Sequence, residues 1–417
     1  IESFDITIST DSNQIALAPG YLQKEWKKEG RNVFHYTMNV PMENQYAIIS
    51  ANYKVLQDKV SIPIEGQTKE VDLAVYYHSG HAYNIDKMMN AMKESLHYYS
   101  KHFGPYQYRQ MRILEFPRYT PFAQSFPNTV PFSEGIGFVM EIEEGDTDIP
   151  FYITAHELGH QWWGDQVTGP FVKGVGMLIE TLTQYSAAMV TRNVYSEEAL
   201  RPIILHELNR YLTGRKKEVL YEQPLAEVEE QEYIHYGKGL INMYALQDYI
   251  SEDSVNLALR RLVRDFPSRV GRHPTTKDVI NYFRAVTPDS LQFLVTDLFE
   301  KIVLFENKTV AAFYQELVDG QFEVSLEIQA QKWESDKNGI STEVDFEQWI
   351  DIGIYASNTN GKDSLIYQRK HKIITGSNKL RIRVPNRPSR AGIDPINKLI
   401  DRDPMDNVRS VIIQNGF

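Results

Sequence analysis

The most constraining feature of this chain of 417 residues is the segment His156-Glu157-Leu158-Gly159-His160. In an α-helix, residues four positions apart lie on the same face, so the two imidazole rings can point at one cation, with Glu157 beside them. A buried helix that carried these three side chains without a metal would leave polar groups unpaired at a high cost in free energy. The segment therefore predicts a buried helix in which His156 and His160 are metal ligands.

A third ligand is expected on a following helix, because catalytic zinc sites take three protein ligands and leave one position open. Glu180 is the only acidic residue in the apolar, alanine-rich stretch 176–190, whose pattern is helical. An isolated carboxylate among apolar neighbours needs a partner. We expect His156, His160 and Glu180 to bind one Zn²⁺ per chain, with Glu157 reaching a metal-bound water, and Gln184 to hydrogen-bond nearby.

The composition excludes several classes of protein and ligand. The formal net charge of −11 disfavours binding to a phosphate backbone, so we expect no nucleic acid partner. The chain has no Cys, which excludes disulfides and thiolate ligands and leaves His and carboxylates to bind any metal. No run of about 18 apolar residues is present. Because the sequence opens with Ile1, we expect it to be a fragment of a longer parent.

Hydrophobic patterning predicts a multidomain α+β protein. Polar and apolar residues alternate near both ends of the chain, whereas the middle shows mainly helical spacing, for example at residues 84–102. The expected parts are an N-terminal β module (1–67), a catalytic domain (68–250), a helical region (251–319) with helices at 253–266, 276–286 and 290–303, and a C-terminal β-sandwich (320–417).

The block 156–164, with Glu180 behind it, resembles the gluzincin zinc aminopeptidases, the family of alanyl aminopeptidase and leukotriene hydrolase. The resemblance extends to Phe103-Gly104-Pro105-Tyr106 and to Tyr236-Gly237-Lys238-Gly239, which is similar to a Y-x-K-G element of the family. It implies a thermolysin-like catalytic domain at 68–250, flanked by the β module, the helical region and the β-sandwich.

The same resemblance implies roles for two further residues. Tyr236 matches the tyrosine that stabilises the tetrahedral intermediate in the family, and a phenol can donate to a developing oxyanion. Glu134 is all that survives of the family's G-x-M-E-N motif, whose glutamate binds the free amine of the substrate. We therefore expect a zinc metallopeptidase that acts on peptides and releases their N-terminal residues.

Two alternatives stay open at this point. The broken motif around Glu134 favours a zinc endopeptidase or oligopeptidase with an open groove. A catalytically idle zinc-binding domain of a transporter-fused protein is the second alternative.

Residues 123–129 and 393–402 are most similar to peptidase domains that some bacteria fuse to transporter permeases. This resemblance implies a parent with transmembrane segments and an extracytoplasmic position for the present residues.

Overall fold

The computed structural model of the protein describes residues 3–414 except 43, 65, 267–270, 359–360 and 362. The chain forms two compact units. The first unit contains Ile1–Ile203, Ala226–Glu230 and Gln247–Ser290, and the second contains Ile204–Leu225, Gln231–Leu246 and Leu291–Phe417. The helices α4 (Glu197–Lys217) and α5 (Gly239–Ile250) contribute residues to both units. Helices and several sheets occur together, which confirms the predicted α+β multidomain class.

The N-terminal strands form two antiparallel sheets. The first has the order β1-β4-β3, and the second pairs β2 with β5. Apolar side chains of β4, including Phe34 and Tyr36, are buried, while the polar side chains next to them, His35 and Thr37, are only half-buried. The bounds are β1 (Phe4–Thr10), β2 (Ile15–Leu17), β3 (Tyr21–Lys28), β4 (Arg31–Met38) and β5 (Ile49–Ala51).

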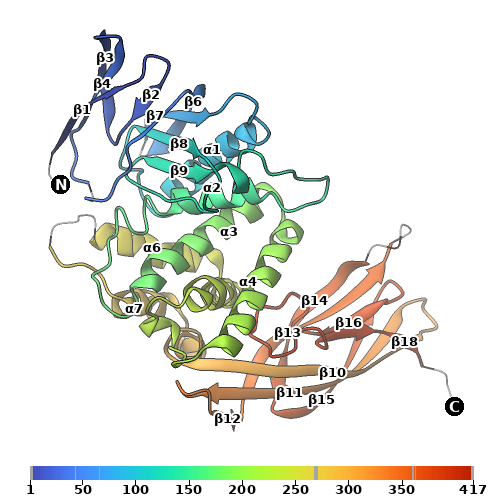
Figure 1. The fold of residues 1–417 in the computed structure, drawn as a ribbon. Coiled ribbons are helices and arrows are strands. Elements are labelled where there is room, and N and C mark those ends of the chain that lie inside the picture. Colours follow the sequence, from blue (N-terminus) through green and yellow to red (C-terminus); the bar gives the residue numbers. More distant parts are fainter. Residues whose placement is uncertain are drawn as a thin grey trace. The chain divides into compact units, whose positions relative to one another are not determined.

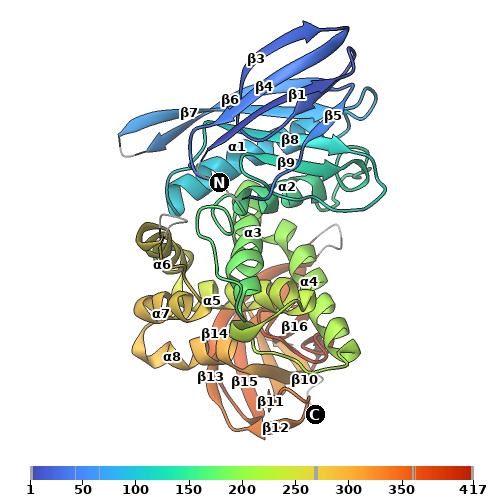
Figure 2. The same cartoon turned by 60° about the vertical axis from the view of Figure 1, so that its left-hand side comes forward.

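A four-stranded mixed sheet follows, with the order β6-β7-β8-β9 (Figure 2). β6 (Lys54–Ile64) pairs with β7 (Gln67–Tyr77) in an antiparallel hairpin, and β7, β8 (Gln110–Phe116) and β9 (Thr129–Ser133) are parallel. β6 therefore belongs to the same sheet as the later strands, although the expected β module extended to residue 67. Alternation alone identifies a strand but does not identify its partner.

Helix α1 packs on this sheet, and the other helices of the first unit lie beyond it (Figure 1). α1 connects β7 to β8 and buries Met88, Met92, Leu96 and Tyr99 at helical spacing. The helices are α1 (Ile85–His102), α2 (Ile149–Gly159), the π-helical turn η2 (Met177–Thr181), α3 (Leu182–Val194), α6 (Glu252–Asp265) and α7 (Thr276–Val286).

The second unit contains a β-sandwich whose two sheets enclose a core that includes Val324, Ile328, Ile352 and Ile393. One sheet has the order β12-β11-β10-β18 with β15 paired to β11, and the other is β14-β13-β16-β17. The strands are β10 (Ile302–Glu316), β11 (Phe322–Ser335), β12 (Ser341–Val344), β13 (Glu347–Ser357), β14 (Asp363–Ile374), β15 (Gly376–Val384), β16 (Arg390–Ile393), β17 (Val408–Ser410) and β18 (Ile412–Ile413).

The expected helical region 251–319 differs from the structure at its end. Short helices, α8 (Gln292–Val295) and the π-helical η6 (Thr296–Glu300), end before Ile302, and β10 occupies much of the remaining segment. The apolar run at the start of β10 has no clear period, so sequence patterning alone does not separate it from the preceding helix. Among the described residues, no helix combines the length and the apolar character needed to cross a membrane.

Candidate metal centre

The first metal-binding segment is held on α2. Asp148 caps the helix by accepting a hydrogen bond from the backbone N–H of Phe151 at 3.1 Å, and Pro150 occupies the first turn, where a missing N–H costs nothing. The Tyr99 hydroxyl of α1 donates to the backbone carbonyl of Ala155 at 2.7 Å. His160 keeps helical dihedral angles at the C-cap, so both predicted histidine ligands lie on one helical face.

The aromatic residues after His160 anchor this end of α2. Trp162 and Trp163 are completely buried. The Trp162 indole N–H donates to the carbonyl of Gly104 at 3.0 Å, and the Trp163 indole donates to Ser186 Oγ at 2.9 Å. The Phe-Gly-Pro-Tyr segment identified in the sequence therefore packs against the metal-binding segment through Gly104.

Glu180 lies on η2, directly before α3. Helices α2 and α3 approach closely at Gly159 of α2, where a Cβ atom would lie 3.0 Å from Thr183 Cγ2 of α3. Only glycine allows this approach without a shift of the neighbouring threonine. The close packing of α2 on α3 brings Glu180 to the two histidines.

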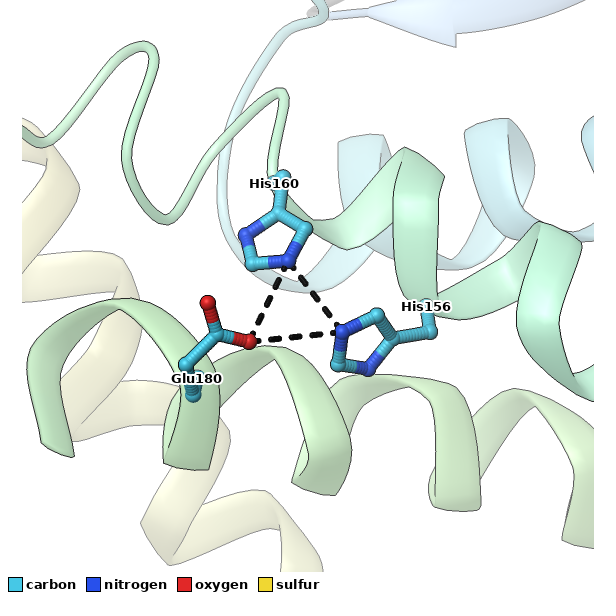
Figure 3. A group of neighbouring side chains, drawn as sticks. All are labelled: His156, His160 and Glu180. Carbon is cyan, nitrogen blue, oxygen red and sulfur yellow. Dashed lines mark hydrogen bonds and ion pairs between the residues drawn. The ribbon is translucent and has the colours of Figure 1, made fainter. Parts of the chain in front are cut away.

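Figure 3 shows the three predicted ligands pointing toward one another from the two helices. His156 Nε2 and His160 Nε2 are 3.1 Å apart, and Glu180 Oε2 lies 3.5 Å and 3.4 Å from them. Ligand atoms bound tetrahedrally to zinc at 2.0–2.1 Å are separated by about 3.3 Å. Glu180 Oε2 is buried and has no hydrogen-bond partner, as a ligand oxygen should be. The residues therefore fit Zn²⁺.

Hydrogen bonds orient both imidazole rings. His156 Nδ1 lies 3.0 Å from Gln184 Oε1, and His160 Nδ1 lies 3.1 Å from the carbonyl oxygen of Trp163. Since both partners are acceptors, each ring donates from Nδ1 and directs Nε2 at the metal position. The Tyr152 hydroxyl donates to the same Gln184 oxygen at 2.8 Å. The predicted hydrogen bonding by Gln184 is confirmed, whereas the contributions of Tyr152 and Trp163 had no sequence signal.

The electrostatic environment of the site is strongly coupled. Burial raises the pKa of Glu157 above its ordinary value, the two histidines oppose this effect, and Glu180 adds to it. Burial acts to lower the pKa of His160, but the carboxylates of Glu180 and Glu157 raise it to about 9. Burial likewise opposes the charged form of Glu180, but His160 and His156 hold its pKa well below the usual range. Glu157, a buried carboxylate with a raised pKa next to the residues that would bind the metal, is suited to accept and return a proton.

Glu134 begins the short 3₁₀ helix η1 (Glu134–Ile136), directly after β9. Its Oε1 lies 3.4 Å from Arg118 Nε, and its Oε2 lies 3.7 Å from His81 Nδ1. Glu134 therefore lies in the first unit with the three predicted ligands and Glu157, but in a separate cluster of side chains.

Tyr236 lies in the second unit, on the π-helical segment η4 (Tyr233–Lys238). Its ring is 4.6 Å from that of His235 and receives the Arg210 guanidinium at 4.5 Å. A Cβ atom at Gly237 would lie 2.8 Å from the carbonyl oxygen of Glu207, so glycine allows η4 to pack on α4. Burial lowers the pKa of Lys238 to about 8.

A comparison with protein families matches the Peptidase family M1 domain to residues 87–295, which make up half of the chain. The chain belongs to peptidase family M1. The matched range contains Glu134, the segment from His156 to His160, Glu180 and Tyr236. The resemblance to gluzincin aminopeptidases is thus confirmed at the level of the family.

Curated and solved relatives agree with this assignment. The chain is 26% identical to Probable aminopeptidase 1 of Sulfurisphaera tokodaii over 172 residues, which cover 39% of this chain and 22% of that protein. Among solved structures, the M1 zinc metallopeptidase of Deinococcus radiodurans has a TM-score of 0.53 at 17% identity and covers 71% of this chain and 62% of its own. Legionella pneumophila aminopeptidase A in complex with aspartic acid has a TM-score of 0.61 at 16% identity and covers 100% and 45%, respectively.

These similarities establish the M1 fold, and the chain spans less than a quarter of the curated relative. Membership of a family of zinc metallopeptidases implies Zn²⁺ as the cofactor, as the sequence predicts, and the clustered ligands fit that ion.

Proposed function

We propose that this M1 chain is a zinc-dependent metallopeptidase that releases N-terminal residues from peptides. The observation that carries the proposal is the cluster of His156, His160 and Glu180, whose ligand atoms all lie within 4.8 Å of one another. Residues 68–250 would act as a thermolysin-like catalytic domain.

His156, His160 and Glu180 would hold the metal, and the Nδ1 atoms of the two histidines are already directed to acceptors. Zinc bound there lowers the pKa of water toward 7 and polarises a carbonyl group. Glu157, buried beside the ligands, would accept the proton of the attacking water and transfer it to the leaving amine. The raised pKa of Glu157 supports this exchange, because a base must also be able to act as an acid.

Two further residues would complete the reaction. Tyr236 would donate from its hydroxyl to the oxyanion that develops on the scissile carbonyl. Glu134 would pair with the free ammonium of the substrate, and a charge-assisted contact of this kind limits cleavage to the first residue. Its partly buried carboxylate lies 3.7 Å from His81 Nδ1 and 3.4 Å from Arg118 Nε.

The test is hydrolysis of a peptide library by the zinc-loaded protein, with free N-termini in one half and acetylated N-termini in the other. The proposal expects turnover of the free peptides and strong inhibition of turnover by acetylation. Equal cleavage of both halves would indicate an endopeptidase, the alternative favoured by the incomplete motif around Glu134. Stoichiometric zinc without any turnover would indicate an idle zinc-binding domain.

The fusion to transmembrane segments of a transporter permease and the extracytoplasmic position stay predictions from sequence resemblance. Mass spectrometry of the native protein and fractionation of its cells would test both.

A further inference from the structure

Glu115 is a completely buried carboxylate that the proposed reaction does not use. It lies on β8, which is parallel to β9, and β9 ends at Ser133, directly before Glu134. The Tyr53 hydroxyl donates to the Glu115 backbone carbonyl at 2.6 Å, and the backbone N–H of His78 donates to Glu115 Oε2 at 2.5 Å. A buried carboxylate is expensive to place there, and the His78 N–H on the carboxylate and the Tyr53 hydroxyl on the backbone carbonyl make Glu115 rigid once placed.

His81 joins this carboxylate to Glu134. Its Nδ1 is in direct hydrogen-bond contact with Glu115 Oε1 and lies 3.7 Å from Glu134 Oε2. In the described part of the chain, no other basic side chain forms an ion pair with Glu115. His81 therefore lies between two carboxylates that would otherwise repel each other.

The backbone around His81 is built to hold this position. The His81 N–H donates to the carbonyl of His78 at 3.0 Å, and Gly80 between them has a φ of +92°, which a type II turn requires. In the same loop between β7 and α1, buried Asn84 donates to the backbone carbonyls of Gly137 and Met140 at 2.7 and 2.8 Å. The turn that positions His81 is thus tied to the segment that follows Glu134.

We propose that His81 is a positioning residue, which uses the buried Glu115 as an anchor to hold Glu134 for the substrate amine. This inference rests on the proposed function of Glu134. Glu134 Oε2 lies within ion-pair distance of His81 Nδ1, at 3.7 Å, and the partner of Glu134 Oε1, Arg118, is 72% exposed at its side chain. A surface ion pair of this kind is weak, so an incoming ammonium can replace it.

The same three side chains could also be considered a second metal site, since their ligand atoms lie within 4.8 Å of one another. Direct hydrogen bonding between His81 Nδ1 and Glu115 Oε1 argues against it, because an ion would have to separate these two atoms. A second bound zinc ion is therefore an outcome that the experiment must be able to detect.

The experiment compares His81→Ala with His81→Asn, whose amide nitrogen can replace the Nδ1 donor. The measured quantities are kcat/KM for a free peptide and its N-acetyl counterpart, and the inhibition constants of a free amino acid and its N-acetyl derivative. We expect His81→Ala to reduce the preference for the free amine about tenfold, which is the scale of one charge-assisted hydrogen bond between Glu134 and the substrate ammonium. His81→Asn should retain most of this preference. A purely structural role would lower activity on both substrates together.

His97→Ala, at an exposed histidine of α1, is the matched control and should leave the preference unchanged. Zinc content and thermal unfolding are measured for every variant. Unchanged preference in folded His81→Ala would overturn the inference, and so would two zinc ions in the wild type that become one in the variant. A wild type without any preference for free amines would instead refute the proposed role of Glu134, so the two failures are distinguishable.

Discussion

Replacement of Gln184 by Leu tests whether the hydrogen bonds behind the histidines hold the metal site in place. Gln184 Oε1 accepts from His156 Nδ1 at 3.0 Å and from the Tyr152 hydroxyl at 2.8 Å, and all three residues are buried. Leucine is similar in size but offers no acceptor, so two buried donors lose this partner.

Two effects of Gln184→Leu can be estimated. Depriving a buried donor of its acceptor costs about 1–3 kcal/mol, so the metal-free protein should lose roughly 2–6 kcal/mol of unfolding free energy. Loss of a hydrogen bond that orients a metal-binding histidine typically lowers metal affinity about 10- to 100-fold. The first effect is measured by urea unfolding without metal, and the second by competition for zinc with a chromophoric chelator.

Gln247→Leu provides the control. Gln247 is 8% exposed and accepts a hydrogen bond from Arg192 at 3.3 Å, away from the histidine ligands. This variant should lose stability but bind zinc as the wild type does. If Gln184→Leu also bound zinc with wild-type affinity, the hydrogen bond to His156 would not orient the ligand and the reasoning would fail.

Three other changes have expected outcomes. Gly159→Ala places a Cβ atom 3.0 Å from Thr183 Cγ2 and should cost about 1–3 kcal/mol in thermal unfolding, with recovery when Thr183→Ser removes the clash. Tyr236→Phe should lower kcat roughly 100- to 1,000-fold with unchanged zinc content, and a smaller loss in peptide assays would exclude it as the oxyanion donor. Burial raises the pKa of Asp401 to about 7, so the folded state retains a proton that the unfolded state releases above about pH 4. The unfolding free energy should therefore fall as pH rises from 4 to 7, and Asp401→Asn should flatten this dependence in urea titrations.

The sequence predicted the elements whose patterns are local. Helical spacing at Met88, Met92 and Leu96 corresponds to the buried face of α1, and the alternating residues of β11 and β13 line the core of the sandwich. The pairing of β6 with β7 and the start of β10 at Ile302 were not predicted, because both depend on contacts with strands elsewhere in the chain.

In the candidate site, too, residues marked by a local pattern were predicted and residues placed by tertiary packing were not. The spacing of His156 and His160 on one helix is a local property, and the solitary Glu180 in an apolar stretch indicated a buried carboxylate. The roles of Tyr152 and the Trp163 carbonyl depend on tertiary packing and leave no local pattern.

The cluster around Glu115 had one signal, a charged residue within an apolar strand. Its partner His81 is distant in sequence, so the sequence alone did not join them. The proposed roles of Glu134 and Tyr236 stay predictions until variants are measured.

The most direct test of the central claim is the zinc content and peptide hydrolysis of Glu157→Gln. Glu157 is not among the three clustered ligands, so the variant should retain one zinc ion per chain. Without the carboxylate that accepts and returns the proton, hydrolysis of free peptides should fall about 100- to 10,000-fold. Wild-type turnover by a zinc-loaded Glu157→Gln protein would contradict the account.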